Sequence, residues 1–327
     1  MNILITGGAG FIGSNLAFEI NRKYPDYKVT IFDKFNTRER RDNGNFKYFG
    51  DYKNIIGLDA EIRTGDLNNS DDIKLLLQNK YDIIFHQGAI SDTTVLNQAE
   101  VIRTNSDSFD YFIDYCLKFD CKLIYASSAG TYGNTESPNI VGKGEIPENV
   151  YGYSKLLMDL KTRNFLSINK KAHVVGLKYF NVYGPGEIYK RKTSSMILQL
   201  AKQAMDKSSI RLFKFGEQRR DFVYISDVVE ANLAAINAQP GIYNVGSGVS
   251  RSFNDIYNCL QNELDTEISV EYFDNPYTFY QNNTCADLNI NKIDFNFTPK
   301  VTLEIGIAQY MKIIKNYTKG EWQAFQE

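Results

Sequence analysis

The chain has 327 residues, of which 43% are hydrophobic and 23% charged, and this composition supports a large buried core. Its formal net charge of -2 and its pI of about 5.9 argue against a general attraction to nucleic acid or to anionic membranes. The four cysteines form no CxxC pair and there are only two histidines, so we expect no metal site.

The opening residues enter an apolar strand directly, without the basic and long apolar regions of a secretion signal. No uncharged apolar stretch approaches the roughly 20 residues that a membrane span needs. We therefore expect a cytoplasmic location and no membrane partner.

Six apolar runs rich in β-branched residues alternate with helical stretches, and such alternation predicts an α/β fold with a doubly wound parallel sheet, the Rossmann arrangement. The predicted strands lie within 2–6, 28–33, 61–66, 82–89, 122–128 and 173–184. After Tyr183 the alternation loosens into the loop "GPGEIYKRKTSS", followed by an amphipathic helix from about Met196. Residues 221–236 are predicted to form a further helix, and "GIYNVGSG" a short strand and turn.

The stretch "ITGGAGFIGSNLA" follows the first strand and opens the first helix, with Gly7, Gly10 and Gly13 at GxxGxxG spacing. Glycines there permit a tight turn and a close approach of backbone to a pyrophosphate, and the helix N-terminus favours the anion. The context predicts dinucleotide binding, with Phe11 and Ile12 beside the cofactor; the alternative is a purely structural turn.

Asp33 ends the second strand, about 20 residues after the last glycine, where an acid binds the ribose hydroxyls of NAD. Cations follow at once, and they suit the 2′-phosphate of NADP unless they form a solvated loop. They are Lys34, Arg38, Arg40 and Arg41. Charge alone leaves NAD and NADP equally possible.

Further cofactor contacts are expected at the ends of the next two strands. Asp66 and Leu67 follow the third strand and can border the adenine, although Asp66 also suits a helix cap. Gln87, Gly88 and Ala89 end the fourth strand at the edge where cofactors bind.

Ser127 and Ser128 end the fifth strand, and Tyr151 and Lys155 follow on the next helix at YxxxK spacing, which places them on one helix face. Tyrosine has a pKa of roughly 10, so it acts as a base near neutrality only beside a cation. A hydroxyl donor, a tyrosine and a lysine together indicate a hydride-transfer site rather than a surface pair. Tyr153 is expected to be packed.

The motifs "TGGAGFIG", "YASSAGTYG", "YGYSK", "KYFNVYGPGE" and "RRDFVYISDV" resemble the extended short-chain dehydrogenase/reductase superfamily over essentially the whole chain. Within it, "HQGAISDTT", "NVYGYSK", "KYFNVYGPGEIYK" and "YQNNTCADL" most closely resemble the ADP-L-glycero-D-manno-heptose 6-epimerase family. The resemblance implies epimerisation at carbon 6 of ADP-D-glycero-D-manno-heptose by transient oxidation with bound NADP, in the supply of heptose for the lipopolysaccharide core.

The resemblance also implies residue roles. Tyr151 and a lysine after "NVYGP" are the two acid/base residues, and ungapped counting places that lysine at Lys190, with Lys192 as the alternative. Ser128 orients the reacting alcohol or ketone, Lys155 tunes Tyr151 and holds the nicotinamide ribose, and Asn105 structures the cofactor site. The residues expected to bind the nucleotide sugar are Ser91, Ser128, Asn181, Lys190, Lys192, Phe213, Arg220 and Tyr280.

Two domains are expected: a dinucleotide-binding domain over 1–181 plus about 221–246, and a smaller substrate-binding domain over about 182–220 and 247–327. Relatives in the superfamily generally self-associate, so a homo-oligomer is expected.

Two alternatives remain open. A UDP-hexose 4-epimerase would use one tyrosine for both faces of the sugar and leave Lys190 idle, and a regulator that senses dinucleotides would bind cofactor without turnover. A 4,6-dehydratase is disfavoured, because Ala129 and Gly130 stand where such enzymes carry an acidic pair.

Overall fold

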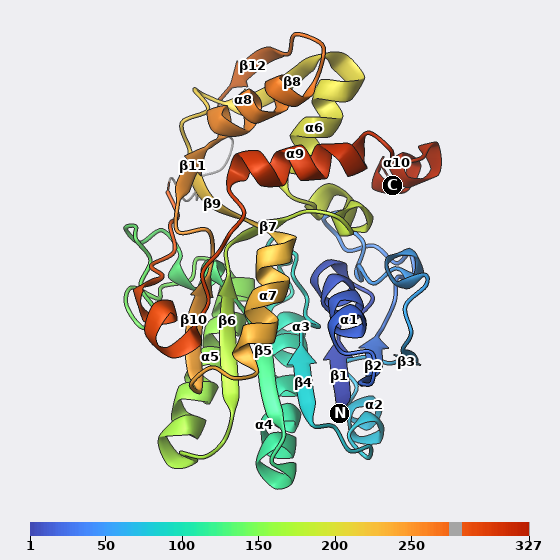
Figure 1. The fold of residues 1–327 in the computed structure, drawn as a ribbon, viewed down its shortest axis with the longest axis vertical. Coiled ribbons are helices and arrows are strands. Elements are labelled where there is room, and N and C mark those ends of the chain that lie inside the picture. The colour runs from blue at the N-terminus through green and yellow to red at the C-terminus, as the bar shows by residue number, and fades with distance from the viewer. Residues whose placement is uncertain (275–282, 327) are drawn as a thin grey trace.

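The computed structural model describes residues 1–274 and 283–326. Its centre is a seven-stranded sheet in which every strand is parallel to its neighbours, in the order β10-β6-β5-β4-β1-β2-β3 (Figure 1). The predicted doubly wound α/β fold is thereby confirmed. The strands are β1 (Asn2–Thr6), β2 (Lys28–Asp33), β3 (Glu61–Thr64), β4 (Ile83–His86), β5 (Lys122–Ser128), β6 (Val174–Tyr179) and β10 (Gly241–Val245).

The inner strands of this sheet are largely apolar because both of its faces are covered there, whereas the edge strand β3 is mostly exposed. Side chains alternate along β1, so Ile3 and Ile5 join one buried cluster while Leu4 joins the other. Helices α1 (Phe11–Lys23) and α7 (Ile225–Ala235) supply the first cluster. The other face is covered by α2 (Ser70–Leu76), α4 (Ser108–Phe119) and α5 (Val150–Ile168). Shorter turns lie between them: η1 (Tyr52–Ile55), α3 (Gln98–Ile102), η2 (Arg103–Asp107) and η3 (Ala129–Tyr132).

Most of the chain after β6 lies beyond the carboxyl ends of the sheet strands (Figure 1). It contains a three-stranded sheet in the order β11-β9-β7 and a two-stranded sheet of β12 and β8. The strands are β7 (Asn181–Tyr183), β8 (Ser209–Phe213), β9 (Arg219–Tyr224), β11 (Ser250–Ser252) and β12 (Ser269–Phe273). The helices are η4 (Glu187–Thr193), α6 (Met196–Lys207), α8 (Phe253–Glu263), η5 (Asn291–Phe295), α9 (Leu303–Ile314) and α10 (Lys319–Gln326).

Two predicted elements differ in the structure. The predicted strand over 173–184 is two strands, because the chain leaves β5 and β10 after Tyr179 and then pairs with β9 as β7. The predicted helix over 221–236 begins only at Ile225, since the residues before it form β9, the central strand of the three-stranded sheet. A short apolar run does not distinguish a buried strand from a helix.

Within residues 1–274 and 283–326, no helix is long and apolar enough to cross a membrane. The same residues contain no group of three or more histidine, cysteine or acidic side chains that could hold a metal ion. The boundaries of the two expected domains stay a prediction.

Candidate active site

A cavity of about 860 Å³ lies at the carboxyl ends of the central strands and continues between them and the smaller sheets. Ligands bind at this edge in doubly wound folds, at the point where the strand order reverses, here between β1 and β4. The cavity brings together twenty of the residues predicted from the sequence. They are Gly7, Gly10, Phe11, Ile12, Gly13, Asp33, Lys34, Asp66, Leu67, Gln87, Gly88, Ala89, Ser91, Ser128, Tyr151, Lys155, Asn181, Lys190, Phe213 and Arg220.

The glycine-rich turn forms one wall of the cavity. Gly7 has a φ of 67°, and a Cβ on it would lie 2.6 Å from the Gly88 nitrogen. A Cβ on Gly13 would lie 2.3 Å from the Gly7 carbonyl oxygen. The helix α1 begins at Phe11 without a side-chain cap, so its first-turn N–H groups and its dipole remain available to an anion. This close-packed turn and uncapped helix end fit a dinucleotide pyrophosphate.

Asp33 is buried at the end of β2. Its carboxylate accepts hydrogen bonds from the backbone N–H of Ala9 over 3.0 Å and of Phe35 over 2.9 Å, so it joins the glycine-rich turn to the second strand. Burial raises its pKa, and these backbone donors oppose the rise. Gly50 covers it closely, since a Cβ there would lie 2.1 Å from Asp33 Oδ1.

Of the four cations predicted near the ribose, Lys34 lines the cavity. Its ammonium lies 2.5 Å from an Asp66 carboxylate oxygen and donates to the Tyr48 hydroxyl over 2.7 Å. Arg41 pairs instead with Glu100 over 2.8 Å. The other two predicted cations, Arg38 and Arg40, are exposed, and none of the three arginines lines the cavity.

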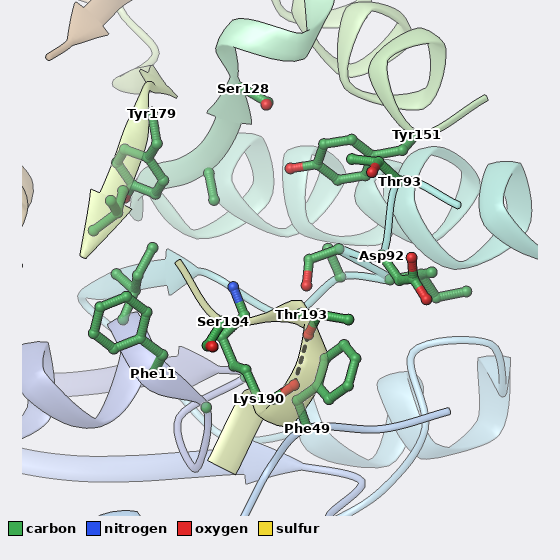
Figure 2. A pocket seen from close by; sticks show the side chains of 18 of the residues that line it. Phe11, Phe49, Asp92, Thr93, Ser128, Tyr151, Tyr179, Lys190, Thr193 and Ser194 are labelled. Atoms are coloured by element: carbon green, nitrogen blue, oxygen red, sulfur yellow. Dashed lines mark hydrogen bonds between the residues drawn. The ribbon is translucent and has the colours of Figure 1, made fainter. Parts of the chain in front are cut away.

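Tyr151 and Ser128 meet on the sheet side of the cavity (Figure 2). Asn149 caps α5 by accepting from the Gly152 N–H over 2.8 Å, and this cap places Tyr151 in the first turn of the helix. Burial raises the pKa of Tyr151, while a hydrogen bond with Ser128 partly lowers it. Ser128 ends β5 and also accepts a hydrogen bond from the Gly130 N–H over 3.0 Å. Tyr153 is 45% exposed, so the expectation that it is packed was wrong.

Lys155 is buried one turn after Tyr151. Its ammonium donates to the Ala126 carbonyl oxygen over 2.7 Å, which anchors α5 to β5. Burial lowers its pKa to about 8, and the negative charge of Asp159 opposes the fall. Lys155 lies one turn from Tyr151 on α5 and lines the same cavity, while its hydrogen bond goes to the strand; its effect on Tyr151 stays a prediction.

Lys190 enters the cavity from η4, where it is half buried. Figure 2 shows its amino group and the Tyr151 hydroxyl pointing into the same space from different elements. Burial lowers the pKa of Lys190, and the negative charges of Glu187 and Asp92 oppose the fall. Lys192 is exposed and does not line this cavity. The arrangement puts one ionisable side chain on each of two elements around a single space.

Two further predicted residues, Asn105 and Gln87, act through hydrogen bonds. Asn105 is fully buried outside the cavity lining, and its side chain bonds to both the N–H and the carbonyl of Ile90 and to the Ser154 hydroxyl. It thereby holds the loop after β4 against α5. The Gln87 amide accepts from Tyr179 and donates to Asn232, each over 3.0 Å.

The far end of the cavity is lined by Phe213 and Arg220, from β8 and β9. Arg220 is 8% exposed and donates to the Arg219 carbonyl over 2.8 Å. Phe213 comes from the two-stranded sheet and Arg220 from the three-stranded sheet. Tyr280 lies outside the described residues.

Sequence reasoning missed several residues that line the cavity. Lys47, Tyr48 and Phe49 reach it from a loop that has no regular structure, and Arg211 and Phe273 reach it from the two-stranded sheet. The basic residues after Asp33 were a signal for this loop. From these basic residues we predicted Arg38, Arg40 and Arg41 as cofactor contacts and not Lys47. The sequence could not show that Lys47 reaches the cavity, because the fold of the loop depends on tertiary contacts.

Comparisons with known proteins agree with this geometry. Residues 3–246 match the model of the NAD dependent epimerase/dehydratase family. The ADP-L-glycero-D-manno-heptose-6-epimerase of Brachyspira hyodysenteriae is 33% identical over 321 residues, covering 96% of this chain and 98% of that protein. The match confirms the resemblance found in the sequence.

Among solved structures, the ADP-L-glycero-D-manno-heptose-6-epimerase of Helicobacter pylori superposes with a TM-score of 0.87 at 46% identity, over 97% of this chain and 96% of that one. A UDP-N-acetylglucosamine 4-epimerase from Methanobrevibacter ruminantium has a TM-score of 0.83 at 26% identity, over 97% and 99%. Both structures are nucleotide-sugar epimerases by their descriptions.

Proposed function

This chain belongs to the NAD dependent epimerase/dehydratase family, and on that premise we propose that it converts ADP-D-glycero-D-manno-heptose into ADP-L-glycero-D-manno-heptose. It is thus an enzyme of the isomerase class. The observation that carries the proposal is the placement of Tyr151 and Lys190 on separate elements around one cavity. The product would serve the heptose region of lipopolysaccharide, and the enzyme would act in the cytoplasm as a homo-oligomer.

A nicotinamide dinucleotide is the cofactor of this family. When bound, it supplies the oxidation of carbon 6 and its reduction again, so that no net redox change occurs. The turn at Gly7, Gly10 and Gly13 would hold its pyrophosphate, and Lys155 and Tyr151 would adjoin its nicotinamide ribose.

We propose NADP rather than NAD, with NAD as the alternative. Two observations support this choice. The Asp33 carboxylate is 8% exposed and already accepts two backbone hydrogen bonds, which reduces what it can offer to ribose hydroxyls. Lys34 and Lys47 line the cavity, and although they pair with Asp66 and Glu39 their ammonium groups would also donate to a 2′-phosphate.

The residues around the cavity would manage the proton of the carbon 6 hydroxyl. Oxidation requires that this hydroxyl lose its proton, and reduction of the resulting ketone requires that its oxygen regain one. Tyr151, oriented with Ser128, would serve the oxygen in one orientation, and Lys190 would serve it when the opposite face of carbon 6 is presented. Burial lowers the pKa of Lys190, which favours proton transfer by its amino group near neutrality. Burial raises the pKa of Tyr151, so Tyr151 would depend on its hydrogen bond with Ser128 and on nearby positive charge to act as a base.

A UDP-hexose 4-epimerase is the second candidate, supported by the similarity to the Methanobrevibacter ruminantium enzyme. It would leave Lys190 without a role, although burial of a lysine in a cavity costs free energy and its pKa is lowered. A dinucleotide-sensing regulator would have no need for Tyr151 and Lys155 in the cavity. A 6-epimerase would use all three side chains, Tyr151, Lys155 and Lys190.

The test is to incubate the purified protein with ADP-D-glycero-D-manno-heptose in deuterated water, without added cofactor, and to follow the carbon 6 proton by NMR. Conversion to the L-glycero isomer with little deuterium at carbon 6 would establish a 6-epimerase with an internally recycled hydride. No conversion by a sample that holds intact oxidised cofactor, together with turnover of a UDP-hexose, would establish the 4-epimerase instead. Bound cofactor without turnover of either sugar would favour the regulator.

A further inference from the structure

The segment that carries Lys190 is short, so its position depends on side-chain contacts. The buried Glu187 carboxylate accepts hydrogen bonds from the Gly184 N–H over 3.1 Å and from the N–H and hydroxyl of Ser195 over 2.5 and 2.8 Å. The Thr193 hydroxyl donates to the Lys190 carbonyl oxygen over 2.8 Å (Figure 2). These bonds fix the two ends of residues 184–195 and the Lys190 carbonyl, but none of them holds the side chain of Arg191.

The residue after Lys190 breaks the 3₁₀ helix. Arg191 has a φ of 57° and a ψ of -128°, which is not a helical conformation. Residues other than glycine are strained at positive φ, and they persist there only where their surroundings hold them. The direction of the chain next to Lys190 therefore depends on what holds Arg191.

The Arg191 side chain is held by two other segments. Its Nε donates to the Ala324 carbonyl oxygen in α10 over 2.8 Å, and its guanidinium carbon lies 3.8 Å from the centre of the Phe46 ring. Arg191 as a whole is only 6% exposed. A buried guanidinium requires such partners, because its desolvation is costly.

The helix that supplies this carbonyl is itself anchored. Trp322 in α10 packs edge-on against Tyr317 and Phe325, and its ring centre lies 4.7 Å from the Lys202 ammonium of α6. The helix packs against η4, at the C-terminal end of the chain (Figure 1). Ala324 thus presents its carbonyl from a fixed position.

The loop that supplies Phe46 also reaches the cavity. Asn43 and Asn45 donate to the Asp92 carboxylate over 3.0 and 2.8 Å, and Asp92 lines the cavity with Lys190. The same loop therefore contacts Arg191 on one side and a cavity carboxylate on the other. Movement of Arg191 would therefore also disturb the loop that bonds to Asp92 in the cavity.

We propose that Arg191 is a positioning residue for Lys190, through which the C-terminal helix α10 and the Phe46 loop hold the Lys190 amino group in the cavity. This inference rests on the proposed function, in which Lys190 moves a proton. A displacement of about 1 Å at a reacting group can cost about a hundredfold in rate. Arg191 would therefore affect the rate of chemistry much more than substrate binding.

The first test replaces the guanidinium by an apolar chain of similar length. Arg191→Met should lower kcat for ADP-heptose epimerisation about 10- to 100-fold, change KM less than about threefold, and leave the content of bound cofactor unchanged. Arg191→Lys should restore part of kcat, because an ammonium can still donate to the Ala324 carbonyl. The matched control is Arg22→Met, which removes an exposed arginine paired with Glu19 and should leave both constants unchanged.

The second test changes α10 instead of Arg191. Trp322→Ala should lower kcat in the same direction by loosening α10, and it also serves if Arg191→Met fails to fold. If α10 acts through Arg191, the double variant loses no more kcat than the Arg191→Met variant alone. Losses that multiply, or a loss of kcat that follows only the fraction of unfolded protein, would overturn the proposal.

One comparison separates this inference from the proposed function. An inactive Lys190→Ala beside an Arg191→Met with normal kcat would overturn the positioning role and leave the two-base assignment standing. A fully active Lys190→Ala would overturn both.

Discussion

The Lys178 ammonium lies 2.6 Å from the Asp159 carboxylate, and both side chains are completely buried beside the carboxyl end of β5. The carboxylate also accepts hydrogen bonds from Tyr125 over 2.8 Å and from Ser127 over 2.9 Å. Asp159 lies two turns after Tyr151 on α5, so the pair joins the helix that carries Tyr151 to β5 and β6. The position of Tyr151 over the sheet therefore depends on this buried network.

Replacing the buried carboxylate should destabilise the fold. Asp159→Asn removes one of the two carboxylates that balance Lys178, the other being Glu145 at 3.1 Å, and breaking a buried ion pair from one side typically costs about 3 kcal/mol. Urea unfolding followed by circular dichroism would measure the change. Asp110→Asn is the control, because it removes an exposed carboxylate 2.9 Å from Lys161 and should change the free energy of unfolding by less than about 1 kcal/mol. Equal losses in the two variants would contradict the role of the buried pair.

Glu145 should make stability depend on pH in the acid range. Burial alone would raise its pKa, but a bidentate hydrogen bond with Arg163 and the charge of Lys178 lower it from 4.5 to about 2. A lowered carboxyl pKa stabilises the fold above the unfolded value and loses that effect as pH falls from about 4.5 towards 2. The loss should reach about 3 kcal/mol. Urea unfolding of wild type and Glu145→Gln at a series of pH values would check this, and parallel curves would contradict it.

Lys155 should be needed for activity and unfavourable for stability. Its pKa is lowered by burial from 10.5 to about 8, so the charged form is penalised in the folded state. Below pH 8 both states are protonated and the full penalty applies, whereas from 8 to 10.5 the folded state loses its proton first and the penalty fades. Lys155→Met should therefore be inactive yet about 2 kcal/mol more stable near neutrality, after allowance for the lost bond to Ala126. Denaturant unfolding at neutral and alkaline pH would measure this, and a less stable variant at neutral pH would contradict it.

Much of the fold followed from local pattern. The central strands are buried on both faces and are continuous apolar runs, so their positions could be predicted, and the glycine spacing located the first turn. Residue spacing also placed Tyr151 and Lys155 on one helix face beside the cavity.

The parts that could not be predicted depend on contacts between distant segments. Lys47 and Phe49 reach the cavity because Asn43 and Asn45, in the loop before them, donate hydrogen bonds to Asp92. No local sequence pattern predicts these bonds. The non-helical conformation of Arg191 depends on Phe46 and Ala324, which are far away in the sequence. Helical spacing also could not show that the Lys155 ammonium bonds to the Ala126 carbonyl.

The glycine-rich turn should be sensitive to a single methyl group. Gly13→Ala would place a Cβ 2.3 Å from the Gly7 carbonyl oxygen, so α1 must shift and the pyrophosphate cradle must open. The variant should retain less cofactor after purification, with a fall in affinity of about tenfold or more. Absorbance of the released dinucleotide would measure this. Gly241→Ala is the matched control, because its Cβ would lie at ordinary contact distance, 3.6 Å, from the Tyr243 hydroxyl oxygen; equal cofactor loss in both would contradict the prediction.

Tyr151→Phe and Lys190→Ala should each abolish most of the epimerisation while cofactor stays bound. In the proposed mechanism each variant removes the group that handles the carbon 6 hydroxyl proton in one orientation of the sugar, and a positioned acid or base typically contributes about 10² to 10⁴ in rate. Steady-state conversion of ADP-D-glycero-D-manno-heptose followed by NMR would measure kcat. Cofactor content would show whether the cavity is intact.

The control variants change a tyrosine and a lysine that are exposed to solvent. Tyr153→Phe alters an exposed tyrosine on the same helix, and Lys207→Ala removes an exposed lysine of α6, so both should keep wild-type rates. Near-full activity in Lys190→Ala would contradict the two-base mechanism, because Tyr151 would then suffice for both orientations. Since a single base that serves both faces is what a 4-epimerase requires, that result would also redirect the assay to UDP-hexoses.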